Sequence, residues 1–192
     1  MRAVIEAPSI LKDIERLAAR QELPIIGPEK GKVLVDVLKR YRPKRILEIG
    51  TLVGYSSILM GQHLPEDGTI TTIEIDRDMA ALAREHFEEA GLSKRIAVQT
   101  GPALEVIPGL VGPFDMLFLD AAKDEYYRYL KTTEPKLAEH AVVVADNVKI
   151  FEDQLHDFLN YVRYGNKYRS RTFDFGFDAV EVSEKMMWDN TN

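Results

Sequence analysis

Two stretches of this chain have the same sequence pattern: FDMLFLD at residues 114–120 and VVVADN at residues 142–147. Each is an apolar run that ends in a carboxylate, which predicts a buried parallel strand with an acid at its carboxyl end. Open α/β sheets bind their ligands at that edge. If the strands are neighbours, about 4.8 Å apart, Asp120, Asp146 and Asn147 converge on one point. Mg²⁺ and Ca²⁺ prefer such oxygen donors, so we predict a cation site there.

The composition is that of a globular chain. It has 192 residues, 45% hydrophobic and 29% charged, which predicts a single domain over residues 1–192. The absence of cysteine excludes disulfides, a thiol nucleophile and thiolate metal sites. A net charge of −6 argues against general nucleic-acid binding. No apolar run is long enough to span a membrane, and residues 1–12 lack a signal-peptide core. We therefore expect a cytoplasmic protein with no membrane partner.

The hydrophobic pattern predicts two N-terminal helices and then alternating strands and helices. The helices span residues 9–20 and 27–41, within an N-terminal part at 1–42. Strands are expected at 45–49, 69–75, 96–99, 114–119 and 141–145, with an antiparallel pair at 169–174 and 179–183, and helices at 55–63, 78–90, 125–131 and 153–163. This alternation predicts a Rossmann-like, doubly wound α/β core over residues 43–192, with helices on both faces of the sheet.

A glycine turn follows the first predicted strand. Gly50 allows the backbone to bend and a ligand to approach, and the next helix points its free N–H groups at the turn. A dinucleotide site requires glycine at position 52, where this chain has Leu52, so a ligand without phosphates is favoured. Glu74 ends the second strand, where a carboxylate accepts hydrogen bonds from both hydroxyls of a ribose. Together these features indicate an adenosine-type ligand.

With these features in place, the chain resembles the class I S-adenosylmethionine-dependent O-methyltransferases. Within that class it is similar to the cation-dependent branch of catechol and caffeoyl-CoA O-methyltransferases, over residues 25–182. The motifs are Leu47-Glu48-Ile49-Gly50-Thr51 with Gly54-Tyr55-Ser56, then Thr72-Ile73-Glu74, then Leu119-Asp120 with Lys123-Asp124, and Ala145-Asp146-Asn147-Val148. The resemblance implies a seven-stranded, mostly parallel sheet with an antiparallel C-terminal strand.

The resemblance also implies the roles of individual residues. Asp120, Asp146 and Asn147 would hold Mg²⁺ or another divalent cation such as Mn²⁺ or Ca²⁺, and Lys123 would be the general base. S-adenosylmethionine would be bound by Ile26, Glu48, Gly50, Ser56, Glu74, Ile75, Ala103 and Asp120. The implied reaction methylates a hydroxyl of a small catechol-like or vicinal dihydroxy acceptor, which the cation orients and acidifies. The resemblance leaves open whether the protein forms a homodimer.

The chain departs from the catechol enzymes on the substrate side. Those enzymes have an aromatic gate before the lysine, where this chain has Ala122, and a serine and a glutamine beside the adenine, where it has Ala103 and Leu104. The acid that orients the second catechol hydroxyl has no clear counterpart before Asp178, with Asp174 as a loose candidate. We therefore expect an open pocket that accepts a bulkier substrate.

Other interpretations remain open. Each proposed site residue also has a purely structural explanation. Asp120 could cap the following helix, Asp146 and Asn147 could form a turn, and Lys123 could be a solvated lysine at a helix start. The basic, tyrosine-rich segment 158–173 is of a kind that binds nucleic acid or an anionic coenzyme A thioester. A transfer-RNA hydroxyuridine O-methyltransferase with RNA as partner is therefore the alternative. Two further alternatives are an NAD(P)-dependent oxidoreductase and a catalytically silent binding module.

Overall fold

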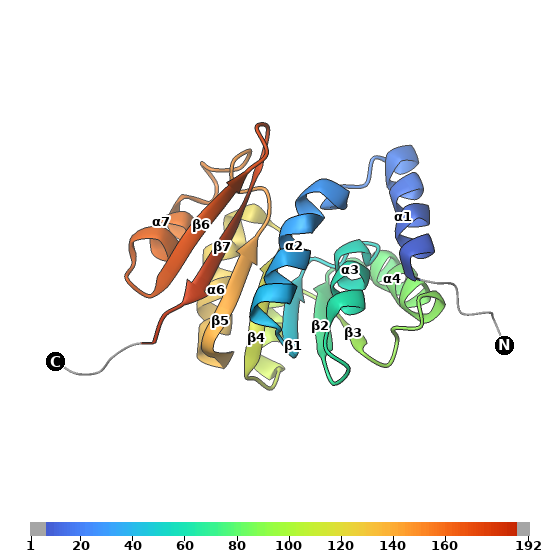
Figure 1. Cartoon of the computed structure of the whole chain (residues 1–192), viewed down its shortest axis with the longest axis horizontal. Coiled ribbons are helices and arrows are strands. Elements are labelled where there is room, and N and C mark those ends of the chain that lie inside the picture. The colour runs from blue at the N-terminus through green and yellow to red at the C-terminus, as the bar shows by residue number, and fades with distance from the viewer. Residues whose placement is uncertain (1–6, 188–192) are drawn as a thin grey trace.

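A sheet of seven strands forms the centre of the molecule in the computed structural model, which describes residues 7–187 (Figure 1). The strands are β1 (Arg45–Ile49), β2 (Thr69–Glu74), β3 (Ile96–Thr100), β4 (Phe114–Leu119), β5 (Leu137–Ala145), β6 (Tyr168–Asp174) and β7 (Ala179–Lys185). Their order across the sheet is β3-β2-β1-β4-β5-β7-β6. Strands β1 to β5 are parallel, whereas β7 runs antiparallel to β5 and β6. The predicted Rossmann-like fold with an antiparallel C-terminal strand is confirmed.

Helices cover both faces of the sheet, as predicted. One face carries α1 (Ala7–Gln21), α2 (Gly27–Tyr41), α3 (Tyr55–His63) and α4 (Arg77–Glu89). The other face carries α5 (Ala103–Val106), α6 (Tyr126–Thr133) and α7 (His156–Tyr164). Short 3-10 helices complete the connections: η1 (Ile107–Gly109), η2 (Lys123–Glu125) and η3 (Glu134–Lys136). Within residues 7–187, no helix has the length and apolar character needed to cross a membrane.

The central strand β4 shows why both faces must be covered. Met116 and Phe118 point into the apolar cluster beneath α1 to α4, and Leu117 and Leu119 point into the cluster beneath α5 to α7. All four side chains are fully buried, because successive residues of a strand face opposite sides of the sheet. A strand buried on both sides requires an uninterrupted apolar run, which is the pattern seen at residues 114–119.

Two elements begin three or more residues away from the predicted position, and the other predicted elements begin within two residues of it. Strand β5 starts earlier, at Leu137, which pairs with Phe114 of β4. The exposed Glu139 and His140, which interrupt the apolar pattern, lie where the register shifts before pairing resumes at Val142. Helix α7 starts later, at His156, because residues 151–155 form successive turns. Neither difference affects the strand ends at which ligands were predicted to bind.

The N-terminal helices, predicted within residues 1–42, have no separate core. Ile14 of α1 and Leu34 of α2 belong to the same apolar cluster as Ile58 of α3 and Phe118 of β4. Residues 1–6, part of the segment searched for a signal peptide, lie outside the described residues.

Three strands end level with one another at the carboxyl edge. The register pairs Ile49 of β1 with Leu119 of β4, and Leu119 with Ala145 of β5. Two further hydrogen bonds extend this ladder: Asp120 N–H donates to Ile49 O (2.9 Å), and Asp146 N–H donates to Leu119 O (3.0 Å). The two carboxylates therefore follow neighbouring strands, as the sequence predicted.

Gly50 allows β1 and β4 to continue side by side past their ends. Its φ is +101°, a conformation that side chains disfavour, and a Cβ atom there would lie 2.0 Å from the carbonyl oxygen of Asp120. Any residue larger than glycine would therefore displace the backbone that carries Asp120.

Replacing Gly50 with alanine should lower the free energy of unfolding by at least about 1–3 kcal/mol, because the backbone conformation alone costs that much. Gly109→Ala is the matched control, since a Cβ atom there meets nothing within 4 Å. The control should leave stability unchanged or raise it by up to about 1 kcal/mol. Urea unfolding of both variants measures the difference, and equal stabilities would show that Gly50 is not required for the close approach.

Candidate active site

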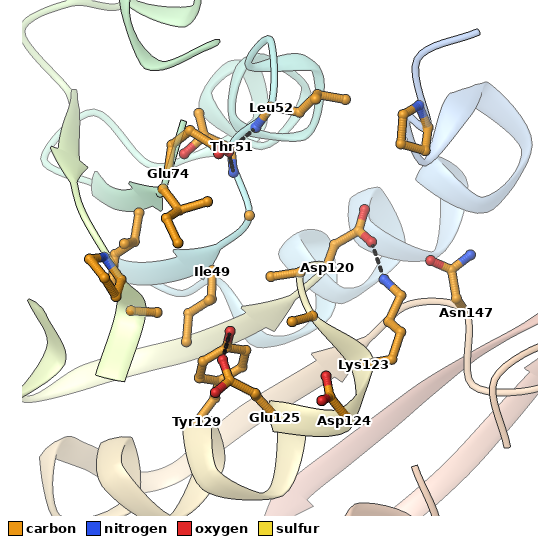
Figure 2. Close-up of a pocket in the computed structure, with 18 of the residues that line it drawn as sticks. Ile49, Thr51, Leu52, Glu74, Asp120, Lys123, Asp124, Glu125, Tyr129 and Asn147 are labelled. Carbon is orange, nitrogen blue, oxygen red and sulfur yellow. Dashed lines mark hydrogen bonds and ion pairs between the residues drawn. The ribbon is translucent and has the colours of Figure 1, made fainter. Parts of the chain in front are cut away.

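A pocket of about 1060 Å³ opens at the carboxyl edge of the parallel strands. Its walls come from the segments that follow β1 to β5 and from the residues that precede α2. Figure 2 shows Glu74 at one end and Asp120, Lys123 and Asn147 at the other. The sequence-predicted residues that line the pocket are Ile26, Gly50, Ser56, Glu74, Ile75, Ala103, Asp120, Lys123 and Asn147. Glu48 and Asp146 do not line it and are buried beneath it.

Glu74 organises the glycine turn. Its Oε2 accepts hydrogen bonds from the N–H groups of Thr51 (3.2 Å) and Leu52 (2.7 Å) (Figure 2). Its Oε1 accepts one from Asp76 N–H (2.9 Å). Leu52 has a φ of +48°, a left-handed conformation that is uncommon outside glycine, and Glu74 holds the turn in that shape. Each carboxylate oxygen has two acceptor sites, so Glu74 keeps one free site, on Oε1, for a hydroxyl group of a ligand.

Glu48 lies beneath the turn. Its carboxyl group is fully buried and accepts hydrogen bonds from the hydroxyl groups of Ser56 and Ser57 at the start of α3. Burial raises the pKa of Glu48 to about 7, although the serine hydroxyls act in the opposite direction. Glu48 therefore supports Ser56, which does line the pocket. Its predicted part in cofactor binding is indirect in this geometry and stays a prediction.

Lys123 is held in the pocket wall by two partners. Its Nζ donates to Asp120 Oδ1 (2.8 Å) and to the hydroxyl of Tyr126 (2.9 Å). The Tyr126 hydroxyl in turn donates to the carbonyl of Leu119 (3.0 Å). Burial raises the pKa of Tyr126 well above its ordinary range, so the phenol keeps its proton. Sequence reasoning did not identify this role of Tyr126, because its helical spacing indicates packing only.

Lys30 of α2 is a site residue that sequence reasoning missed. Its Nζ donates to both carboxylate oxygens of Asp146 (2.7 and 2.8 Å) and to Asp178 Oδ2 (2.7 Å). The available signal was its position on the helix, three residues before Val33 and four before Leu34, which places Lys30 on the buried face. A lysine on such a face almost always has an acidic partner.

Two carboxylates and one amide meet where the cation site was predicted. Asn147 Nδ2 donates to Asp178 Oδ2 (2.8 Å), and Figure 2 shows the amide oxygen turned toward Asp120. Burial and the negative charge of Asp120 raise the pKa of Asp146, and Lys30 acts against that shift.

A hard cation relieves excess negative charge of this kind, and the oxygen donors suit Mg²⁺. Among the described residues, no three or more histidine, cysteine, aspartate or glutamate side chains form a group that could hold a metal ion. The donor set therefore depends on the amide of Asn147, and the metal site stays a prediction.

No aromatic side chain stands immediately before Lys123, although Phe151 also lines the pocket, with its ring centroid 6.0 Å from Lys123 Nζ. Ala122 is exposed and lines the pocket, so the chain leaves this position open. Of the two acids considered from the sequence, Asp174 is exposed and pairs with Lys149 (2.9 Å). Asp178 is buried against Lys30 and Asn147 and is the one that belongs to the site.

The basic segment 158–173 does not form one surface. Arg169 and Arg171 of β6 line a separate groove against α2, on one side of the sheet. Arg163 of α7 lies on the other side, where it forms an ion pair with Glu181 (2.8 Å). The structure thus brings together only some of the basic residues on which the RNA methyltransferase alternative is based. That alternative stays a prediction.

Comparison with known proteins points to one family. Residues 2–157 match the model of a family described as O-methyltransferase. A catechol O-methyltransferase from Niastella koreensis is 39% identical over 127 residues, which cover 64% of this chain and 58% of that enzyme. The catechol O-methyltransferase of Mus musculus is 33% identical over 182 residues, which cover 91% of this chain and 68% of the mouse enzyme. The chain thus spans less than two thirds of the length of the Niastella relative.

A solved structure also points to the O-methyltransferases. The O-methyltransferase TomG from Streptomyces achromogenes, determined in complex with SAM, superposes with a TM-score of 0.84 at 28% identity. The match covers 93% of this chain and 90% of TomG.

The buried Glu48 carboxyl makes the stability of this protein depend on pH. Its pKa rises from an ordinary value of 4.5 to about 7 on folding, so the folded state binds the proton more tightly than the unfolded state. The resulting stabilisation is complete below pH 4.5 and is lost as the pH rises through about 7. Each unit of pKa difference corresponds to about 1.4 kcal/mol.

Glu48→Gln should therefore flatten the fall in unfolding free energy across this pH range, as measured by urea denaturation. Asp146 contributes in the same direction, so the slope should decrease without vanishing. Glu85→Gln, on the exposed side of α4, is the control and should follow the wild type. Parallel curves for wild type and Glu48→Gln would contradict the assignment.

Proposed function

Because this chain belongs to the O-methyltransferase family, we propose that it transfers a methyl group from S-adenosylmethionine to a hydroxyl group of a small acceptor. The supporting observation is a single pocket with Glu74 at one end and Lys123, Asp120 and Asn147 at the other. A donor and an acceptor bound at the two ends would share one cavity, as direct transfer requires. The catechol enzymes of Niastella koreensis and mouse support a catechol-like or vicinal dihydroxy acceptor, and the TomG complex supports the donor.

The donor end of the pocket suits an adenosine ligand. Glu74 has one free acceptor site, on Oε1, for a ribose hydroxyl. Ile75 is 69% exposed and lines the pocket together with Ala103, so these two residues offer apolar surface to the adenine ring. Gly50 and Ser56 border the space for the amino-acid end of the donor.

The acceptor end suits a hydroxyl that must lose its proton. A divalent cation held by Asp120, Asp146 and Asn147 would supply positive charge that lowers the pKa of the acceptor hydroxyl. Lys123, held by Asp120 and Tyr126, would receive that proton at Nζ when it enters the reaction as the free amine. The methyl group then passes from the sulfonium to the oxygen and leaves S-adenosylhomocysteine. Holding both reactants in line contributes up to about 7–11 kcal/mol to catalysis.

The proposal is tested by methyl transfer from labelled S-adenosylmethionine to a simple catechol acid, with Mg²⁺ and with EDTA. We expect transfer with Mg²⁺ and a loss of at least about tenfold with EDTA, because the hydroxyl would no longer be acidified. Transfer that is unaffected by EDTA would remove the cation from the proposal. If neither condition gives transfer while the donor still binds, the catechol acceptor is wrong, and unmodified transfer RNA and coenzyme A thioesters become the acceptors to assay.

Lys123→Met should lower kcat by about 10²- to 10⁴-fold, the usual contribution of a positioned acid or base. Affinity for S-adenosylhomocysteine, measured by calorimetry, should not change, because the donor end of the pocket does not involve this amine. Lys149→Met removes a surface lysine that pairs with Asp174 and serves as the control. A Lys123→Met enzyme with the kcat of that control would exclude Lys123 as the base.

A further inference from the structure

Four side chains from three distant segments meet behind the acceptor end of the pocket. Lys30 comes from α2, Asp146 and Asn147 follow β5, and Asp178 immediately precedes β7. Asp146 is 1% exposed and Asp178 is 5% exposed, so both acids are shielded from water. Asp178 does not line the pocket.

The side-chain contacts of Asp178 converge on one oxygen, Oδ2, whereas Oδ1 accepts a long hydrogen bond from Ile150 N–H (3.5 Å). Its Oδ2 accepts from Lys30 Nζ (2.7 Å) and from Asn147 Nδ2 (2.8 Å). An ionised carboxylate can only accept hydrogen bonds, so Asn147 must present its NH₂ group to it. The amide oxygen is thereby forced to the opposite side, and Figure 2 shows it facing Asp120.

Asn147 would not hold that orientation by itself. The last torsion of an asparagine side chain is broad and roughly two-fold, so the oxygen and the NH₂ group exchange places at little cost. An NH₂ group turned toward a cation would place two donors where an acceptor is required. The backbone of Asn147 has a φ of +60°, so the residue is already held in an uncommon left-handed conformation at this point.

The charges of the cluster also suit a cation. Asp120, Asp146 and Asp178 carry three negative charges, and Lys30 and Lys123 carry two positive charges in ion pairs with them. The formal sum is −1, which attracts a divalent cation, and the ammonium of Lys30 contacts both of the most buried acids, Asp146 and Asp178.

We propose that Asp178, neutralised by Lys30, is a positioning residue that fixes the amide oxygen of Asn147 toward the cation. The inference rests on the proposed function, because it presupposes a cation at Asp120, Asp146 and Asn147. It assigns to Asp178 a role other than contact with the acceptor, since its bonded oxygen is fully occupied by Lys30 and Asn147.

Mn²⁺ binding to the full chain without S-adenosylmethionine tests this, with the free ion followed by electron paramagnetic resonance. Asp178→Ala should weaken Mn²⁺ affinity by about 10- to 100-fold, the usual effect of removing a residue that orients a ligand. Asp178→Asn places a carbonyl oxygen where Oδ2 was and should lose less than about tenfold. Asp174→Ala, on the same hairpin and paired with exposed Lys149, should bind as the wild type does.

A double-mutant cycle separates positioning from general damage. If Asp178 acts through Asn147, then Asp178→Ala should cause no further loss of Mn²⁺ affinity in an Asn147→Ala background. Equal Mn²⁺ affinity of Asp178→Ala and wild type, or additive losses in the cycle, would overturn the inference and leave methyl transfer standing. No Mn²⁺ binding by the wild type would overturn the cation and the inference together, while donor binding and methyl transfer remain separately measurable.

A measurement on the wild type covers the case in which Asp178→Ala does not fold. The side-chain NH₂ protons of Asn147, assigned by their absence in Asn147→Ala, should exchange with solvent more slowly than those of exposed Asn166. Equal exchange rates at the two asparagines would show that the amide is not held, and the inference would fail.

Discussion

The parallel register of β1, β4 and β5 determines where the functional side chains of this protein lie. Ile49, Leu119 and Ala145 are aligned across the sheet, and the ladder continues to the next residue of β4 and of β5. The backbone therefore delivers Asp120 and Asp146 side by side before any side-chain interaction is made. Gly50 is part of the same constraint, since a side chain there would occupy the space of the Asp120 carbonyl oxygen.

Unlike a hydrophobic core, the site buries ionisable side chains. Glu48, Asp146 and Asp178 are all shielded from water, and each has polar partners that compensate for lost hydration. Buried ionic groups are weak contributors to stability, because desolvation offsets much of the attraction between them. Their concentration under one pocket therefore indicates an orienting role, in which Lys30 and Tyr126 hold the groups that face the ligand.

The agreement between sequence and structure is best where the signal is local. The strands at 45–49 and 114–119 have the predicted bounds because both are apolar runs that end at a glycine turn or an acid. The start of β5 was wrong because Leu137 pairs with Phe114 of β4 ahead of an irregular stretch that contains the exposed Glu139 and His140. A pattern of side-chain polarity does not report on backbone pairing of that kind.

The sequence by itself determined where the strands end and which residue types stand there. The spacing of apolar residues and the residues that end a strand are both properties of short segments. It also indicated Glu74, Asp120, Asp146 and Asn147 as residues of one edge. Only the tertiary structure decided which groups neutralise and orient them. Lys30 and Asp178 are 148 residues apart and meet because α2 packs over the sheet beside β7. Such a contact depends on how whole elements pack, and no local pattern in the chain encodes it.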